Sequence, residues 1–286
     1  MPHPRSANRL GPVGALAACA LAAGCSSPPP QPQAQAQASA IAPAHLDLAN
    51  GAVEATYLPP PQVVDARIGR DGAIEVAGQA APMAQVIFST PEGDSFHTAA
   101  DAHGGWVARL PQTGLPRLFA ISSMSHGGAV HAEGALVTIP HANVSAVMVR
   151  AGYAALPIGM SRRPEIVSPE IVSVDYDPGG FAGVSGLAPA NSPVRLGIDG
   201  LPAGVAQADA QGRFAMLATN RRPGFGVHEL EVATSAGVVR RTVMLTPPDP
   251  LSRPYTANGA PGSWTVEWAL NGGGVQTTLL VAPPHA

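Results

Sequence analysis

Two carboxylates close together are the strongest candidates for metal chemistry in this chain. Asp175 and Asp177 stand two residues apart in the run Asp-Tyr-Asp-Pro-Gly-Gly. Carboxylate oxygens in loops are ligands that Ca²⁺ prefers, so the pair is a weak calcium candidate. An acidic turn is the interpretation that we favour, because Asp commonly bonds nearby backbone N–H groups in turns. We expect no cofactor and no other metal.

Other residue types that carry chemistry lack the spacing that chemistry needs. The nine His include no His-x-His or His-Glu-x-x-His pattern, so no metal-ligand set is indicated. The run Gly183-Val-Ser-Gly186 is not Gly-x-Ser-x-Gly, and it falls inside an expected strand rather than at a strand-to-helix elbow. We therefore predict that the protein is not an enzyme.

Residues 1–24 have the features of a secretory signal. Arg5 and Arg9 precede an apolar run over residues 10–23, which is too short to span a bilayer. The following Leu-Ala-Ala-Gly-Cys, ending at Cys25, resembles the lipobox of bacterial lipoproteins. The resemblance implies cleavage before Cys25 and lipidation of its thiol. Cys19 would leave with the signal, so the mature chain would hold no disulfide. An ordinary secretory signal, cleaved elsewhere, is the alternative.

The segment after Cys25 is expected to be a tether. Residues 26–44 are rich in Pro, Gln and Ala and carry no charge, so they cannot bury enough apolar surface to fold. We assign residues 25–60 to a disordered, extended tether. Ser26 stands where Asp would imply retention in the inner membrane. By that resemblance, we expect an outer-membrane lipoprotein in the cell envelope that faces the periplasm.

Composition argues against nucleic-acid binding. The formal net charge is -3, the chain has 16 basic residues, and its longest basic run is Arg-Arg. A protein that neutralises phosphates needs a basic stripe, and none is visible.

An internal repeat organises the rest of the chain. Residues 76–109 align with residues 184–217 without a gap, at an offset of 108 residues. In both copies an Asp-x-x-Gly run precedes an aromatic residue, as expected for a turn followed by a strand with a core anchor. Burial of such a ring contributes on the order of 3 kcal/mol. The matched turn and core positions are Gly78 and Gly186, Asp101 and Asp209, Gly104 and Gly212, and Trp106 and Phe214.

The repeat predicts an all-β fold with two tandem Ig-like β-sandwiches. Short alternating runs recur every 8 to 12 residues or so, with Gly, Pro and Asp between them, and 108 residues is the size of one such sandwich. The pattern V-x-G-x-A, a Val-rich strand and D-x-x-G-x-aromatic resembles bacterial Ig-like modules found in tandem on envelope and adhesive proteins. We expect Ig-like domains at 61–142 and 169–248, an extra strand and linker at 143–168, and a Pro-rich connector with a β-hairpin at 249–286.

Aromatic residues of the C-terminal segment have two interpretations. Trp264 and Trp268 lie four residues apart and share one face of the expected hairpin. We favour a core role for them. The alternative is a binding surface in which they join Tyr255 as a stacking platform.

The combined features favour a binding protein. We expect a non-enzymatic, membrane-anchored envelope lipoprotein whose Ig-like modules bind or space another envelope component. The alternative is a peptidoglycan- or carbohydrate-binding accessory protein that uses the C-terminal aromatic residues. Partners would then be an envelope protein or a cell-wall component, besides the membrane itself, and no nucleic acid.

Overall fold

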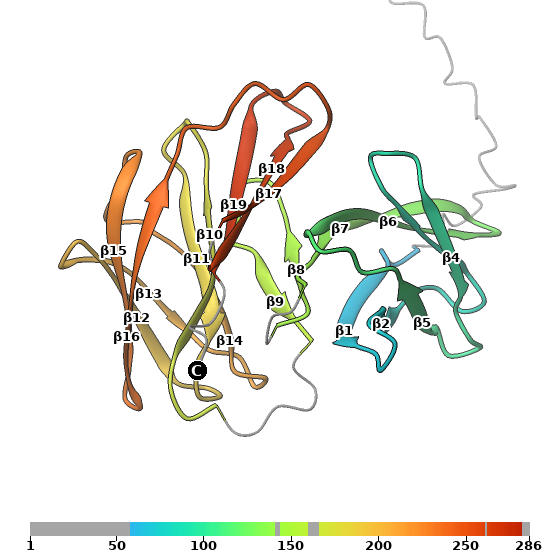
Figure 1. Ribbon diagram of the computed structural model, residues 1–286. Coiled ribbons are helices and arrows are strands. Elements are labelled where there is room, and N and C mark those ends of the chain that lie inside the picture. The colour runs from blue at the N-terminus through green and yellow to red at the C-terminus, as the bar shows by residue number, and fades with distance from the viewer. Residues whose placement is uncertain (1–57, 141–143, 160–165, 261, 282–286) are drawn as a thin grey trace, which may run out of the picture. The chain divides into compact units, whose positions relative to one another are not determined.

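The computed structural model describes residues 58–140, 144–159, 166–260 and 262–281, all within the compact unit Val53–Ala286. These ranges hold 19 strands and no helix, and Figure 1 shows strands along the whole described chain. The predicted all-β class is confirmed. The predicted signal and most of the predicted tether lie outside the described residues.

Module 1, as we call the first sandwich, is made of seven antiparallel strands. Its sheets have the orders β1-β2-β5 and β4-β3-β6-β7, the arrangement of an Ig-like sandwich. Alternate residues point to the space between the sheets, as in strand β5, where every second residue is buried. The strands are β1 (Gln62–Ile68), β2 (Ile74–Gln79), β3 (Gln85–Ser89), β4 (Ser95–Ala99), β5 (Gly105–Leu110), β6 (Arg117–Ser125) and β7 (Gly128–Thr138).

Module 2 repeats this arrangement. Its sheets contain the orders β14-β11-β10 and β13-β12-β15-β16, which match those of module 1 strand for strand. The prediction of two tandem Ig-like sandwiches is therefore confirmed. The strands are β10 (Glu170–Tyr176), β11 (Ala182–Leu187), β12 (Pro193–Ile198), β13 (Leu201–Gln207), β14 (Arg213–Leu217), β15 (Gly226–Thr234) and β16 (Gly237–Leu245).

The offset of the repeat also holds for irregularities of the backbone. Strand β1 changes register between Val63 and Asp65, and β10 does so between Ile171 and Ser173, again 108 residues later. Such bulges re-aim the side chains that follow them. Asp65 and Ser173 are therefore equivalent positions on the outer faces of their sheets.

Five further strands extend the modules. Strands β8 (Ala146–Val149) and β9 (Leu156–Ile158) continue the sheet of module 1 beyond β7. Strands β17 (Tyr255–Ala260), β18 (Ser263–Ala269) and β19 (Val275–Val281) continue the sheet of module 2, with β19 paired to β10.

Two of these strands lie where we expected no regular structure. β9 falls in the expected linker and β17 in the expected connector. Their sequences alternate weakly, so their strand conformation depends on a paired neighbour rather than on local pattern. The expected hairpin is β18–β19, and it is an internal part of a six-stranded sheet rather than a separate hairpin.

Three apolar layers hold the described strands together. One layer lies within module 1 and is centred on Phe88, Trp106 and Phe119. The second lies within module 2 and includes Phe214 and Tyr176. The third is shared by strands β6–β8 of one sheet and strands β10 and β17–β19 of the other, so parts of these two sheets are buried on both faces.

Candidate functional site

The contact between the two modules is the most extensive site that the fold builds, and we call it the junction. Its apolar part brings Leu118, Val137 and Val147 of module 1 against Val172 and Leu280 of module 2. All five side chains are at most 8% exposed. Burial of this many large side chains favours a fixed contact over a flexible linker.

A buried carboxylate forms the polar part of the junction. Asp175 of β10 accepts the backbone N–H of Ala155 at 2.7 Å and the hydroxyls of Thr278 at 2.6 Å and Ser173 at 3.1 Å. Ser173 also bonds Ser185 at 2.8 Å. Burial raises the pKa of the Asp175 carboxyl to about 6, and the three hydrogen bonds oppose part of that rise. Each of these donors is neutral.

An amide of β19 binds the turn that follows β8. The side chain of Gln276 accepts the backbone N–H of Gly152 at 2.9 Å and donates to the carbonyls of Arg150 and Tyr153, each at 3.4 Å. The side chain of Gln276 is fully buried, whereas the turn residues that it contacts are exposed. The amide thus bonds three backbone groups of this turn, in which the N–H of Tyr153 also donates to the carbonyl of Arg150 at 3.1 Å.

Close backbone packing completes the junction. A Cβ on Gly183 of β11 would lie 2.8 Å from the Cβ of Ala154, so only glycine permits this approach. The equivalent position in module 1 is Glu75, which forms an ion pair with Arg67. At this position of the sheet, module 2 therefore has a glycine that allows close packing, and module 1 has a charged residue that forms a surface ion pair.

The predicted aromatic residues lie at the junction. Tyr255 is only 7% exposed, and Trp264 and Trp268 are partly buried against the same apolar cluster. Burial raises the pKa of Tyr255, and the carboxylate of Glu92 in module 1 raises it further. The three rings therefore do not form an open stacking platform, because they are packed between the modules.

The two calcium candidates have separate partners. Asp175 is held as described above, whereas Asp177 accepts the backbone N–H of Phe181 at 2.9 Å and closes the β10–β11 turn. Among the described residues, no three His, Cys, Asp or Glu side chains gather into a metal-ligand group. The structure therefore does not bring these two residues together as one site.

The paired glycines of the repeat lie against the paired rings. A Cβ on Gly78 would overlap the ring of Trp106, and a Cβ on Gly186 would overlap the ring of Phe214. Each glycine also faces the backbone carbonyl of the neighbouring strand. Any side chain at these positions would displace a core ring or a strand.

The paired Asp-x-x-Gly runs form equivalent turns. Asp101 accepts the backbone N–H groups two and four residues further on at 2.8 and 2.9 Å, and Asp209 does the same at 2.9 Å in both cases. These backbone donors lower the pKa of Asp101. Gly104 and Gly212 have φ of 85° and 76°, a region that glycine adopts readily.

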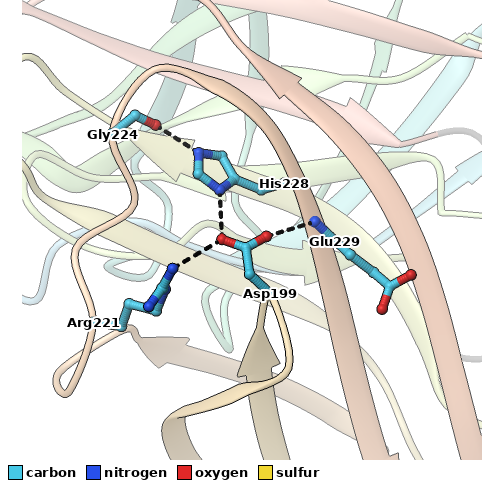
Figure 2. A network of polar contacts seen from close by, with 5 residues as sticks. All are labelled: Asp199, Arg221, Gly224, His228 and Glu229. Carbon is cyan, nitrogen blue, oxygen red and sulfur yellow. Dashed lines mark hydrogen bonds and ion pairs between the residues drawn. The ribbon is translucent and has the colours of Figure 1, made fainter.

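A polar network surrounds Asp199 at the two-residue Asp-Gly turn between β12 and β13 (Figure 2). Its carboxylate accepts the side chains of Arg221 at 3.1 Å and His228 at 2.9 Å, and the backbone N–H of Glu229 at 3.0 Å. The hydrogen bond with His228 is the main reason that the pKa of Asp199 falls to about 2. The other ring nitrogen of His228 faces the carbonyl of Gly224.

This Asp–His pair lacks the geometry of a catalytic dyad. A catalytic His turns its second nitrogen toward a nucleophile or a substrate. In His228 that nitrogen is 2.9 Å from a backbone oxygen. The network therefore positions a loop rather than activating a nucleophile.

The sequence did not reveal the roles of Gln276, Asp199 and His228. It suggested that Asp175 belongs to an acidic turn or a calcium site, whereas the structure places it in the buried junction. One signal was available, because Asp175 interrupts the apolar run Ile-Val-Ser-Val-Asp-Tyr of β10. A carboxylate inside such a run requires buried hydrogen-bond donors. Nothing comparable marks Gln276, whose partners lie more than 120 residues away.

The predicted lipidation site, Cys25, lies outside the described residues. Within the described ranges, no helix has the length and apolar character needed to cross a membrane.

Comparisons with known proteins give no family. No family model matches the chain, and no curated protein matches it. The chain is similar to the central fibronectin-III array of RIM-binding protein at 10% identity and a TM-score of 0.24, over 73% of this chain and 79% of that one. It is also similar to the BSP domain of a biofilm-associated protein at 14% identity and a TM-score of 0.23, over 68% of this chain and 30% of that one. The assignment of two Ig-like sandwiches rests on the strand orders described above.

Proposed function

We propose that this protein is a non-enzymatic lipoprotein of the cell envelope that binds or spaces another envelope component. The observation that carries the proposal is the junction, where Asp175 and Gln276 of module 2 bind the backbone that follows β8. A spacer must hold its binding surfaces at fixed separations, and two modules with a shared buried layer meet that need.

The membrane attachment in this proposal is a lipid on Cys25. Residues 26–57 would separate that lipid from the first described residue. A flexible chain of this length has a root-mean-square span of roughly 30 Å, and an extended polyproline conformation would reach about 100 Å. The modules would thus act at a distance from the outer membrane, on its periplasmic side.

Partner contact is assigned to free strand edges. The six-stranded sheet of module 2 ends in β14 and β17, and its other sheet ends in β13 and β16. An extended segment of an envelope protein can pair with such an edge through backbone hydrogen bonds. The hairpin β18–β19 is paired on both sides, so β17 is the edge that the C-terminal segment offers.

Crosslinking in the native membrane tests the proposal. A photo-crosslinker at Asn258, an exposed residue of β17, should recover one defined envelope protein together with this chain. The same crosslinker at Asp71, on an exposed turn of module 1, is the matched control. Recovery of only abundant membrane proteins from both positions would contradict the proposal. Acyl labelling of the wild type and of Cys25→Ser tests the anchor separately.

A further inference from the structure

The β14–β15 loop is held to the rest of module 2 by the network in Figure 2. This loop, residues 218–225, contributes Arg221 and the carbonyl of Gly224. Asp199 belongs to a different turn, and His228 lies on β15. The imidazole therefore lies between the carboxylate of Asp199 and the loop backbone, and it bonds both at 2.9 Å.

Both partners of the imidazole are hydrogen-bond acceptors. A carboxylate and a backbone carbonyl have no proton to donate, so each contact requires an N–H on the ring. Neutral imidazole carries one N–H, and imidazolium carries two. Both contacts can therefore be hydrogen bonds only when His228 is doubly protonated. The side chain of His228 is 13% exposed, so water has little access to replace a lost partner.

Two opposite charges lie next to the ring. Asp199 is in direct contact, and Arg221 shares the same carboxylate oxygen. Glu229 takes part through its backbone N–H alone. The partner of His228 on β16 is Val243, which is uncharged, and nearby Arg241 bonds a carbonyl of its own strand. Among the described residues, the charged groups of the network are thus one carboxylate and one guanidinium.

The loop also covers apolar surface and shapes a hollow. Phe225 packs edge-on against Tyr176 at 6.4 Å between ring centres, over the core of module 2. Leu217, Thr219 and Arg222 form one wall of an open hollow of about 400 Å³, and the turn at Asp177 forms the other. A movement of the loop would therefore change both the contact of Phe225 with Tyr176 and the shape of this hollow.

We propose that His228 is a proton-controlled latch for residues 218–225, closed when the imidazole carries two protons and loosened when it loses one. Loss of a proton leaves one ring nitrogen facing an acceptor without a hydrogen, which removes one of the two contacts. Histidine is the side chain that commonly changes charge between pH 5 and 8, so the latch responds to mild changes of pH. Opening uncovers the Phe225–Tyr176 pair and widens the hollow.

Nitrogen NMR of the imidazole in the full chain tests the state of the latch directly. The proposal expects two protonated ring nitrogens on His228 in the state in which hydrogen exchange shows the loop protected. Protection of residues 218–229, corrected for intrinsic exchange rates, should fall by about three- to tenfold along the same titration curve as the ring. A neutral ring in the protected state, or protection that does not follow the titration, overturns the proposal.

Two variants separate the latch from general stability. His228→Gln replaces the ring with an amide that does not gain or lose a proton in this pH range, so its loop protection should not change with pH. His131→Gln removes a histidine of β7 in module 1 and should keep the wild-type curve. If His228→Gln fails to fold, Asp199→Asn replaces it, with the same expected loss of the titration. A pH-dependent loop in either folded variant contradicts the latch.

Discussion

The carboxylate of Asp175 accepts the backbone N–H of Ala155 at 2.7 Å, which joins β10 of module 2 to the segment that leads into β9 of module 1. Both residues are fully buried. A buried carboxylate is costly unless donors surround it, so its position is specified by the other side of the junction. This contact and the amide of Gln276 turn two similar sandwiches into one assembly.

Asp175 should make the protein more stable in acid. Its pKa of about 6 in the folded chain lies above the ordinary value of 3.8. A carboxyl whose pKa is raised on folding contributes full stability below pH 3.8, and that contribution is lost as the pH rises through 6. Across the range from pH 4.5 to 7.5, the free energy of unfolding of the wild type should fall by about 2 kcal/mol relative to that of Asp175→Asn in urea unfolding. A constant difference would refute the assignment.

Gln276→Ala should destabilise the protein by about 1–3 kcal/mol, because the buried amide that bonds three backbone groups of the turn after β8 is removed. Gln211 has an exposed side chain and serves as the matched control. Chemical denaturation at pH 7 measures both variants. Equal effects of Gln276→Ala and Gln211→Ala would show that the amide does not hold the turn.

Gly78→Ala and Gly186→Ala should each destabilise the chain by more than about 3 kcal/mol, since the added methyl overlaps a core ring and a strand carbonyl. Gly114→Ala is the control, because no atom lies within 4 Å of its added Cβ. Thermal melts followed by circular dichroism should place the control near the wild type. A mild effect at Gly78 would mean that the ring of Trp106 can move.

Leu280→Ala should cost about 2–5 kcal/mol and affect both modules, because Leu280 is 1% exposed in the layer that they share. Val205→Ala is the control, since Val205 is 79% exposed on β13. Hydrogen exchange followed by mass spectrometry should show faster opening of β6–β8 as well as of β10–β11. Faster exchange confined to module 2 would argue against a shared layer.

The fold of each module could be predicted because its signals are local and repeated. Turns at Asp101 and Asp209, rings at Trp106 and Phe214, and strands of alternating pattern recur at one offset. Gly78 and Gly186 were found in the same way, and the structure adds the steric reason for them. Each of these features is weak evidence by itself. Together they are strong evidence, because a chance match would not repeat the turn, the core ring and the glycine beside it at one offset.

The junction could not be predicted for a physical reason. Val147 and Val172 are buried against the other module, but in sequence they resemble any strand residue that faces its own sandwich. A strand that is buried on both faces lacks the usual alternation of apolar and polar residues. Its sequence therefore does not indicate which face meets its own sandwich and which meets the other module. Asp175 was the one visible anomaly, and its nearness to Asp177 suggested metal ligation instead. The side chains that bind it come from residues up to 103 positions away.

Calorimetry of the full chain tests the central claim most directly, because a shared junction requires the two modules to unfold together. The account predicts one transition at pH 5, with the calorimetric enthalpy equal to the van't Hoff enthalpy, and a shift of that whole transition to lower temperature in Leu280→Ala. Two separate transitions in the wild type, of which Leu280→Ala moves only one, would contradict it.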